Sequence, residues 1–210
     1  MSKRAIGIDI GGTGIKAAIV DVKKGKLLTE RIRVQTPKGG TPKAIADTLS
    51  EVIAALPGNS GLPVGICFPA VVRNGVTMSA ANVSKEWIGL DADALFEKEL
   101  GRTVHVLNDA DAAGLAEAKY GAAKKQKGLV VMATLGTGIG TAIINDGKLV
   151  PNSELGHLQI DGVDYEKMAA YSAKERETLT FPQWAKRLQK YFSTLENLLT
   201  PDLLDRKSTR

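Results

Sequence analysis

Short apolar runs and glycine-rich turns alternate at the start of the chain. Residues 5–10 are typical of a buried strand, residues 15–20 continue as a second strand, and residues 27–36 predict a third strand after a lysine-rich hairpin loop. A glycine turn between two strands differs from the strand, glycine turn and helix that a dinucleotide fold or a P-loop requires. The pattern therefore argues against both of these nucleotide-binding folds.

The apolar residues that follow change to helical spacing. Thr41 offers a capping hydroxyl and Pro42 suits the first helical position, so a helix is predicted to begin here and to end at Pro57-Gly58. The elements predicted next are a strand over residues 63–68, a tight turn at Asn74-Gly75, a helix over 95–100, a strand over 104–107 and an alanine-rich helix over 110–120.

A similar order returns in the second half of the chain. Residues 129–135 predict a strand, a second glycine turn follows, and residues 140–144 and 148–150 predict a hairpin. A helix is predicted from about Thr180 to Thr200, because its apolar residues form one stripe that reads as core. The repeated order predicts an α/β fold of two related lobes, residues 1–108 and residues 109–210, hinged near Asn108.

The two glycine turns are the first candidates for chemistry. One is Gly11-Gly12-Thr13-Gly14, closely followed by Lys16, and the other is Gly136-Thr137-Gly138. Glycine lets the backbone approach an anion closely and present its N–H groups to it. Two such turns predict two phosphate-binding walls and favour a phosphotransferase over a single-turn nucleotide binder. For the first turn alone, the alternative is a tight β-hairpin with a solvated lysine.

Two aspartates end predicted strands, one of them beside a glycine turn. Asp9 precedes the first turn, where a carboxylate can hold Mg2+, usually through water, against phosphates. Asp109 follows the strand over residues 104–107, and it is the candidate base that accepts the proton of an attacking hydroxyl. The alternative role for Asp109 is a helix N-cap, and the two roles are compatible.

Composition narrows the classes of function. The 210 residues carry a formal net charge of +5, with 43% hydrophobic and 24% charged residues, which fits a globular protein with either a polyanionic ligand or a solvated surface. Lysine clusters at residues 23–26 and 124–127 lack interleaved aromatic residues, so no nucleic-acid platform is expected. Cys67 is the only cysteine, which excludes a disulfide within the chain and a cysteine-rich zinc site. No signal peptide or apolar run of transmembrane length is seen, so we expect a cytoplasmic protein without a membrane partner.

Six motifs follow one another along the chain: Ile8-Asp9-Ile10-Gly11-Gly12-Thr13-Gly14-Ile15-Lys16, Phe68-Pro69-Ala70, Ala81-Asn82-Val83, Leu107-Asn108-Asp109-Ala110, Leu135-Gly136-Thr137-Gly138 and Glu154-Leu155-Gly156-His157. In order and spacing they resemble the ROK family, the sugar-kinase branch of the actin-like ATPase fold, and within it the polyphosphate glucokinases. The resemblance covers nearly the whole chain, up to about Asp202.

The resemblance implies transfer of a phosphoryl group to the 6-hydroxyl of glucose, with inorganic polyphosphate and also ATP as donors, Mg2+ as cofactor and Asp109 as base. The residues that it assigns to phosphate are Asp9, Gly11, Gly12, Thr13, Gly14, Lys16, Gly136, Thr137 and Gly138, with Asp9 also toward the metal. The residues that it assigns to the sugar are Asn82, Asn108, Asp109, Glu154 and His157. A homodimer is the implied assembly. The alternatives are an ATP-dependent ROK hexokinase for another hexose and an inactive sugar-binding remnant.

Three departures from the family pattern carry their own expectations. The cysteine-rich zinc motif that many ROK proteins place after Glu-x-x-His is missing, so no zinc is expected, as in the polyphosphate glucokinases. No helix-turn-helix precedes the first strand, which disfavours the ROK repressors. After Pro201-Asp202-Leu203 the tail turns polar and departs from the family sequence. A truncation that leaves the second lobe without a strand is therefore expected.

Overall fold

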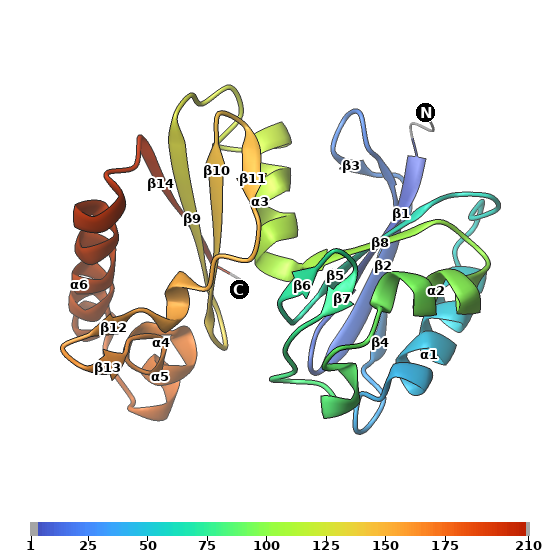
Figure 1. Ribbon diagram of the computed structural model, residues 1–210, viewed down its shortest axis with the longest axis horizontal. Coiled ribbons are helices and arrows are strands. Elements are labelled where there is room, and N and C mark those ends of the chain that lie inside the picture. Colours follow the sequence, from blue (N-terminus) through green and yellow to red (C-terminus); the bar gives the residue numbers. More distant parts are fainter. Residues whose placement is uncertain (1–3, 209–210) are drawn as a thin grey trace. The chain divides into compact units, whose positions relative to one another are not determined.

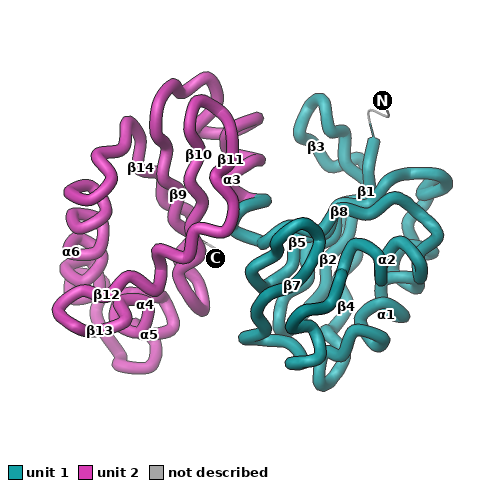
Figure 2. The backbone as a smooth tube through the Cα atoms, in the orientation of Figure 1, with its two compact units in different colours: residues 1–112 teal, residues 113–210 magenta. Residues whose placement is uncertain are grey.

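A computed structural model describes residues 4–208, and the chain divides into two compact units, residues 1–112 and residues 113–210 (Figure 2). The sequence places the division after residue 108, whereas the structure places it inside a helix, α3 (Asp109–Tyr120). In the described part of the chain no helix has the length and hydrophobicity needed to cross a bilayer.

The first unit is built on a six-stranded sheet with the strand order β3-β2-β1-β5-β8, and β4 also pairs with β2 (Figure 1). Its elements are β1 (Arg4–Ile10), β2 (Gly14–Asp21), β3 (Lys26–Leu27), β4 (Ile32–Gln35), α1 (Pro42–Ala54), β5 (Val64–Phe68), β6 (Val72–Arg73), β7 (Val76–Thr77), the 3-10 turn η1 (Lys85–Trp87), α2 (Ala92–Leu100) and β8 (Val104–Asn108). Because β1, β5 and β8 run parallel, their carboxyl ends lie at one edge of the sheet.

Alternation along the strands decides which side chains this sheet buries. Ile6, Ile8 and Ile10 of β1 are buried in one apolar core with the residues of α1 and α2. Asp9 points to the other face, since successive side chains of a strand alternate. The helix α1 begins where the sequence predicts, because the Thr41 hydroxyl accepts the N–H of Ala44 and Pro42 holds the first position.

The second unit has a four-stranded sheet in the order β11-β10-β9-β14. Its elements are β9 (Leu129–Leu135), β10 (Ile139–Asn145), β11 (Lys148–Val150), the 3-10 turn η2 (Leu155–His157), β12 (Gln159–Ile160), β13 (Val163–Asp164), α4 (Glu166–Ala169), α5 (Tyr171–Arg176), α6 (Phe181–Leu199) and β14 (Leu203–Ser208). Figure 1 shows α6 and α3 on opposite sides of this sheet. Each covers its own core, since alternate residues of β9 belong to two separate clusters.

The predicted third strand over residues 27–36 is wrong in its middle. The structure has two short strands, β3 and β4, with a break between them. At the break the hydroxyl of Thr29 accepts the N–H of Ile19 at 3.1 Å. A side chain thus takes the donor that a continuous strand partner would have used, and this ends the ladder.

The expectation of a missing strand after Asp202 is also corrected. Residues 203–208 form β14, which pairs in parallel with β9 from Leu203↔Val130 to Ser208↔Leu135. The two leucines of this polar segment are partly buried on opposite faces of the sheet: Leu203 packs into the core under α3 and Leu204 into the core under α6. The polar residues form contacts of their own, since Nζ of Lys207 lies 3.2 Å from Oε2 of Glu117 on α3.

Candidate functional site

The first glycine turn joins β1 to β2 and is closed by its own backbone. The N–H of Gly11 donates to the carbonyl of Gly14 at 2.9 Å. From behind, Thr36 donates its hydroxyl to the carbonyl of Gly11 at 2.5 Å and its N–H to the carbonyl of Thr13 at 3.4 Å. In the described part of the chain, the N–H groups of Gly12 and Thr13 have no acceptor. The turn therefore presents two adjacent backbone donors, as an anion site requires.

Asp9 and Lys16 flank this turn as paired residues of β1 and β2. The Nζ of Lys16 lies 2.8 Å from Oδ2 of Asp9, and the two side chains are 42% and 47% exposed. An ion pair as exposed as this adds little stability, about 0–1 kcal/mol. Its main effect is to place one carboxylate and one ammonium group beside the free N–H groups of the turn.

Asp109 is the first residue of α3, and its neighbour Asn108 caps that helix. The Oδ1 atom of Asn108 accepts the N–H groups of Ala110 and Asp111 at 2.9 and 3.1 Å. The Oδ1 atom of Asp109 accepts the N–H of Ala110 at 2.8 Å. Burial raises the pKa of Asp109, and the charge of Asp9 raises it further against the opposing hydrogen bond. The capping role considered for Asp109 thus belongs to Asn108, and Asp109 remains a carboxylate near Asp9.

Cys67 lies on β5 and connects these two acids. It pairs with Asp9 across the β1–β5 ladder and with Leu107 across the β5–β8 ladder. Burial, followed by the charges of Asp9 and Asp109, raises the pKa of its thiol to about 12. Cys67 is therefore an inert, protonated thiol beside the two carboxylates, which agrees with the apolar run in which it stands.

The two asparagines predicted to contact the sugar have different surroundings. Asn82 is exposed beside the first glycine turn, so close that a Cβ atom on Gly12 would lie 3.1 Å from the Asn82 Cβ. Asn108 is engaged locally, because its Nδ2 donates to the carbonyl of Ala70 at 3.1 Å while its Oδ1 caps α3. A sugar contact of Asn108 therefore stays a prediction and would use the second hydrogen of its amide.

The second glycine turn joins β9 to β10 in the second unit. The N–H of Gly136 donates to the carbonyl of Gly138 at 3.0 Å, and the N–H of Ile139 donates to Oε2 of Glu166 at 2.7 Å. Ser172 donates its hydroxyl to the carbonyl of Thr137 at 2.5 Å. Across the residues that the structure describes, the N–H groups of Thr137 and Gly138 have no acceptor. Like the first turn, this one presents two adjacent donors.

Glu154 and His157 lie on a short segment held against β10. Glu154 directly precedes η2 and His157 is its last residue, and in a 3-10 turn residues three apart share a side. Gly156 is essential to this contact, since a Cβ there would lie 2.0 Å from the carbonyl oxygen of Ile139. Both side chains are exposed, and the Nδ1 atom of His157 lies 3.3 Å from Oδ2 of Asp164. Their predicted sugar contacts are untested.

Sequence reasoning missed the side chains that hold the two turns. Thr36 reaches a turn 25 residues away, Glu166 one that is 27 residues away and Ser172 one that is 35 residues away. Each is an ordinary polar residue in no recognisable motif. No local pattern could have identified them, because their partners are defined only when the chain folds.

The carboxylates of the first unit fit Mg2+, the cofactor that the family resemblance implies. Magnesium keeps several waters and takes one or two carboxylates besides substrate phosphates. Asp9 is half exposed beside the first turn, and Asp109 is close enough to respond to its charge. No group of three or more His, Cys, Asp or Glu residues gathers in the described ranges. A metal held here would therefore take most of its ligands from water and phosphate.

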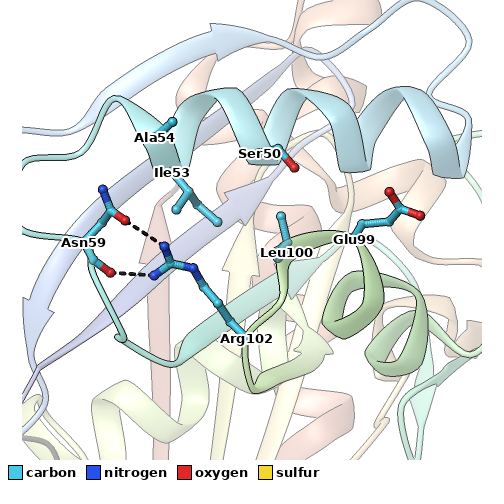
Figure 3. A pocket seen from close by; sticks show the side chains of 7 residues that line it. All are labelled: Ser50, Ile53, Ala54, Asn59, Glu99, Leu100 and Arg102. Carbon is cyan, nitrogen blue, oxygen red and sulfur yellow. Dashed lines mark hydrogen bonds between the residues drawn. The ribbon is translucent and has the colours of Figure 1, made fainter.

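A hollow of about 480 Å³ between α1 and α2 is a separate feature (Figure 3). Its main polar contact is internal: Arg102 donates to the backbone carbonyl and Oδ1 of Asn59 at 2.5 and 2.7 Å. These residues precede β5 and β8, so the hollow lies at the amino edge of the sheet, opposite Asp109. It is not part of the candidate site.

Known proteins resemble this chain in both sequence and structure. The model of the ROK family matches residues 5–177. A polyphosphate glucokinase of Mycobacterium tuberculosis is 48% identical over 202 residues, covering 96% of this chain and 76% of that protein. The solved structure of an inorganic polyphosphate/ATP-glucomannokinase from Arthrobacter sp. strain KM is 53% identical, with a TM-score of 0.92, covering 99% of this chain and 84% of that one.

A more distant structure shares the fold alone. A ROK family glucokinase from Streptomyces griseus, solved with glucose and AMPPNP, is 24% identical with a TM-score of 0.81, covering 98% of this chain and 83% of that one. The predicted α/β class and the actin-like sugar-kinase fold are thereby confirmed. By sequence over most of its length and by fold, this chain belongs to the ROK family.

Proposed function

We propose that this protein phosphorylates glucose at its 6-hydroxyl, with inorganic polyphosphate and also ATP as phosphoryl donors. The observation that carries the proposal is Asp109: a carboxylate at the start of α3 whose pKa is raised and whose neighbour Asn108 caps the helix, in a chain similar to named polyphosphate glucokinases. A group poised in this way suits proton transfer from a hydroxyl.

In the proposed reaction Asp109 accepts the proton of the sugar 6-hydroxyl as its oxygen attacks the terminal phosphorus. The bond between that phosphorus and the bridging oxygen breaks, and the donor leaves one phosphate shorter. The free N–H groups of the two glycine turns, with Lys16, would bind phosphate oxygens of the donor. Mg2+, held toward the donor by Asp9, would supply neutralisation of phosphate charge.

For the sugar, we propose contacts from Asn82, Asn108, Glu154 and His157. Amide, carboxylate and imidazole groups satisfy hydroxyls through paired hydrogen bonds, and a site built from them discriminates strongly against analogues that lack a hydroxyl. The exposure of Asn82, Glu154 and His157 supports this role, because a ligand can reach exposed side chains. A cytoplasmic location stays a prediction from the sequence pattern, and a homodimer stays a prediction from the resemblance.

The test is glucose 6-phosphate formation by the purified protein with Mg2+ and either polyphosphate or ATP. Product with polyphosphate supports the proposal. Product only with ATP, or only with another hexose such as mannose, would replace it with another ROK hexokinase. A folded, monodisperse sample that binds glucose by calorimetry and forms no product would make the chain a sugar-binding remnant.

Salt dependence tests the role of charge in choosing the donor. The exposed lysines at residues 23–26 and 124–127 suit a long polyanion. Raising the ionic strength from 0.05 to about 0.5 M screens such contacts, so the KM for polyphosphate should rise more than the KM for ATP. Equal salt sensitivity of both donors would remove the lysines from donor recognition.

A further inference from the structure

The second glycine turn is held at its exit by a carboxylate from outside the turn. Oε2 of Glu166 accepts the N–H of Ile139, the first residue of β10, at 2.7 Å. We propose that Glu166 is a positioning residue for the phosphoryl donor: it fixes the exit of this turn so that the N–H groups of Thr137 and Gly138 point together at the donor's phosphates. The proposal rests on the proposed phosphotransfer function.

Steric evidence places the carboxylate directly against the turn. A Cβ atom built on Gly138 would lie 2.4 Å from Oε2 of Glu166, far inside van der Waals contact. Gly138 has no left-handed backbone that would itself demand glycine. The absence of a side chain at Gly138 therefore makes room for Glu166, and the carboxylate and the glycine act as one unit.

Glu166 is itself held firmly at the start of α4. Its backbone N–H donates to Oδ1 of Asp164 at 3.3 Å, and Tyr165 before it is buried and stacked on Tyr191, with 6.3 Å between ring centroids. Burial, and after it the charge of Glu166, raises the pKa of Tyr191. The carboxylate is thus anchored between the core of the second unit and the glycine turn.

The hydrogen bonds within and around the turn determine which of its N–H groups are left for a ligand. The N–H of Gly136 is used inside the turn, and the carbonyl of Thr137 is held by the hydroxyl of Ser172. With Ile139 held by Glu166, both ends of the turn are fixed. The donors left for a ligand, Thr137 and Gly138, are adjacent. Binding a phosphate then requires no reordering of the backbone, which is the benefit of preorganisation.

The position and the charge of the Glu166 carboxylate have opposite effects on binding of the phosphoryl donor. The carboxylate positions the turn, but its negative charge repels a polyanionic donor. Glu166→Gln keeps an oxygen that accepts the Ile139 N–H and removes the charge. Glu166→Asp keeps the charge and withdraws the acceptor by one methylene. Glu166→Ala removes both, and Glu196→Ala on α6 removes an exposed carboxylate with no contact to the turn.

The experiment compares these four variants with the unaltered protein. Calorimetry measures tripolyphosphate and glucose binding separately, and amide NMR follows Ile139, Thr137 and Gly138 without turnover. We expect Glu166→Ala and Glu166→Asp to weaken tripolyphosphate binding about tenfold, the loss of one charge-assisted hydrogen bond, and to shift the Ile139 amide signal. Glu166→Gln and Glu196→Ala should stay within about twofold of the original for tripolyphosphate, and glucose binding should be unchanged throughout.

Three results would overturn the proposal. Equal tripolyphosphate affinity in the Ala, Asp and Gln variants would show that the carboxylate does not position the turn. Weaker glucose binding with unchanged tripolyphosphate binding would assign Glu166 to the sugar. An unshifted Ile139 amide in Glu166→Ala would mean that the hydrogen bond does not form in solution. If the unaltered protein bound tripolyphosphate but formed no product, the proposed function would fail while the positioning role survived.

Discussion

Replacing Asp109 with Asn separates the chemistry of this carboxylate from its structural role. The amide keeps the oxygen that accepts the Ala110 N–H at 2.8 Å, and Asn108 continues to cap α3. The shape of the site is therefore retained and only the base is lost. General-base catalysis is worth about 10²–10⁴ in rate, or about 3–5 kcal/mol of transition-state stabilisation. We expect kcat to fall by that factor and glucose affinity to change little.

The same substitution should stabilise the fold at neutral pH. Burial and the charge of Asp9 raise the pKa of Asp109 above its usual value. A raised pKa means that the protonated form favours the folded state at low pH and that this contribution is lost as the pH rises through the folded pKa. At pH 7 the ionised carboxylate therefore costs stability, which Asn avoids. The gain should shrink as the pH falls toward the ordinary carboxyl range.

Two assays on the same samples test this reasoning. Glucose 6-phosphate formation measures kcat, and urea unfolding at several pH values measures the free energy of unfolding. Asp47→Asn provides the control, because Asp47 is an exposed carboxylate on α1. A variant with kcat within tenfold of the original would refute the base role of Asp109. An Asp109→Asn protein that is less stable at pH 7, with the control unchanged, would refute the burial argument.

The remaining predictions concern the thiol, a crowded glycine and the last strand. Cys67, with its pKa raised to about 12, should resist iodoacetamide at pH 8 in the folded protein and react on unfolding in urea, whereas rapid native alkylation would contradict its burial. Gly156→Ala should lower the free energy of unfolding by about 3 kcal/mol in urea titration, because the new Cβ would lie 2.0 Å from a backbone carbonyl oxygen. Gly65→Ala is the control: its Cβ would have no neighbour within 4 Å, so the cost should be less than about 0.5 kcal/mol. Leu204→Ala should lower the free energy of unfolding by about 1–2 kcal/mol, because Leu204 of β14 packs into the core. The control Leu198→Ala should be nearly neutral, because the Leu198 side chain is 63% exposed. Equal effects of the two substitutions would place the tail outside the fold.

Much of the secondary structure could be predicted because its causes are local. Thr41 and Pro42 start α1, and Gly101 ends α2 in the left-handed conformation at φ 60°. Asn74 and Gly75 both have positive φ and turn β6 into β7. In each case the signal lies within a few residues of the feature that it produces, so a single sequence contains it.

Predictions failed where the outcome depended on distant residues. The break after β3 follows from Thr29 taking the N–H of Ile19, and no propensity in the run itself announces this. The polar tail forms a strand because it pairs with the free edge of β9. Leu203 and Leu204 then pack into the two apolar cores on opposite faces of this sheet. A segment with a weak pattern of its own thus obtains its structure from its neighbours.

The sequence by itself determined the two glycine turns, the strand ends that carry Asp9 and Asp109, and membership of a family defined by such motifs, since these depend on residue type and short spacing. Tertiary structure alone decided that Asn108 rather than Asp109 caps α3 and that burial beside Asp9 raises the pKa of Asp109. It also decided that Glu166 holds the second turn from 27 residues away. The physical reason is that burial, charge proximity and long-range hydrogen bonds are properties of the folded chain, and they do not exist along the sequence.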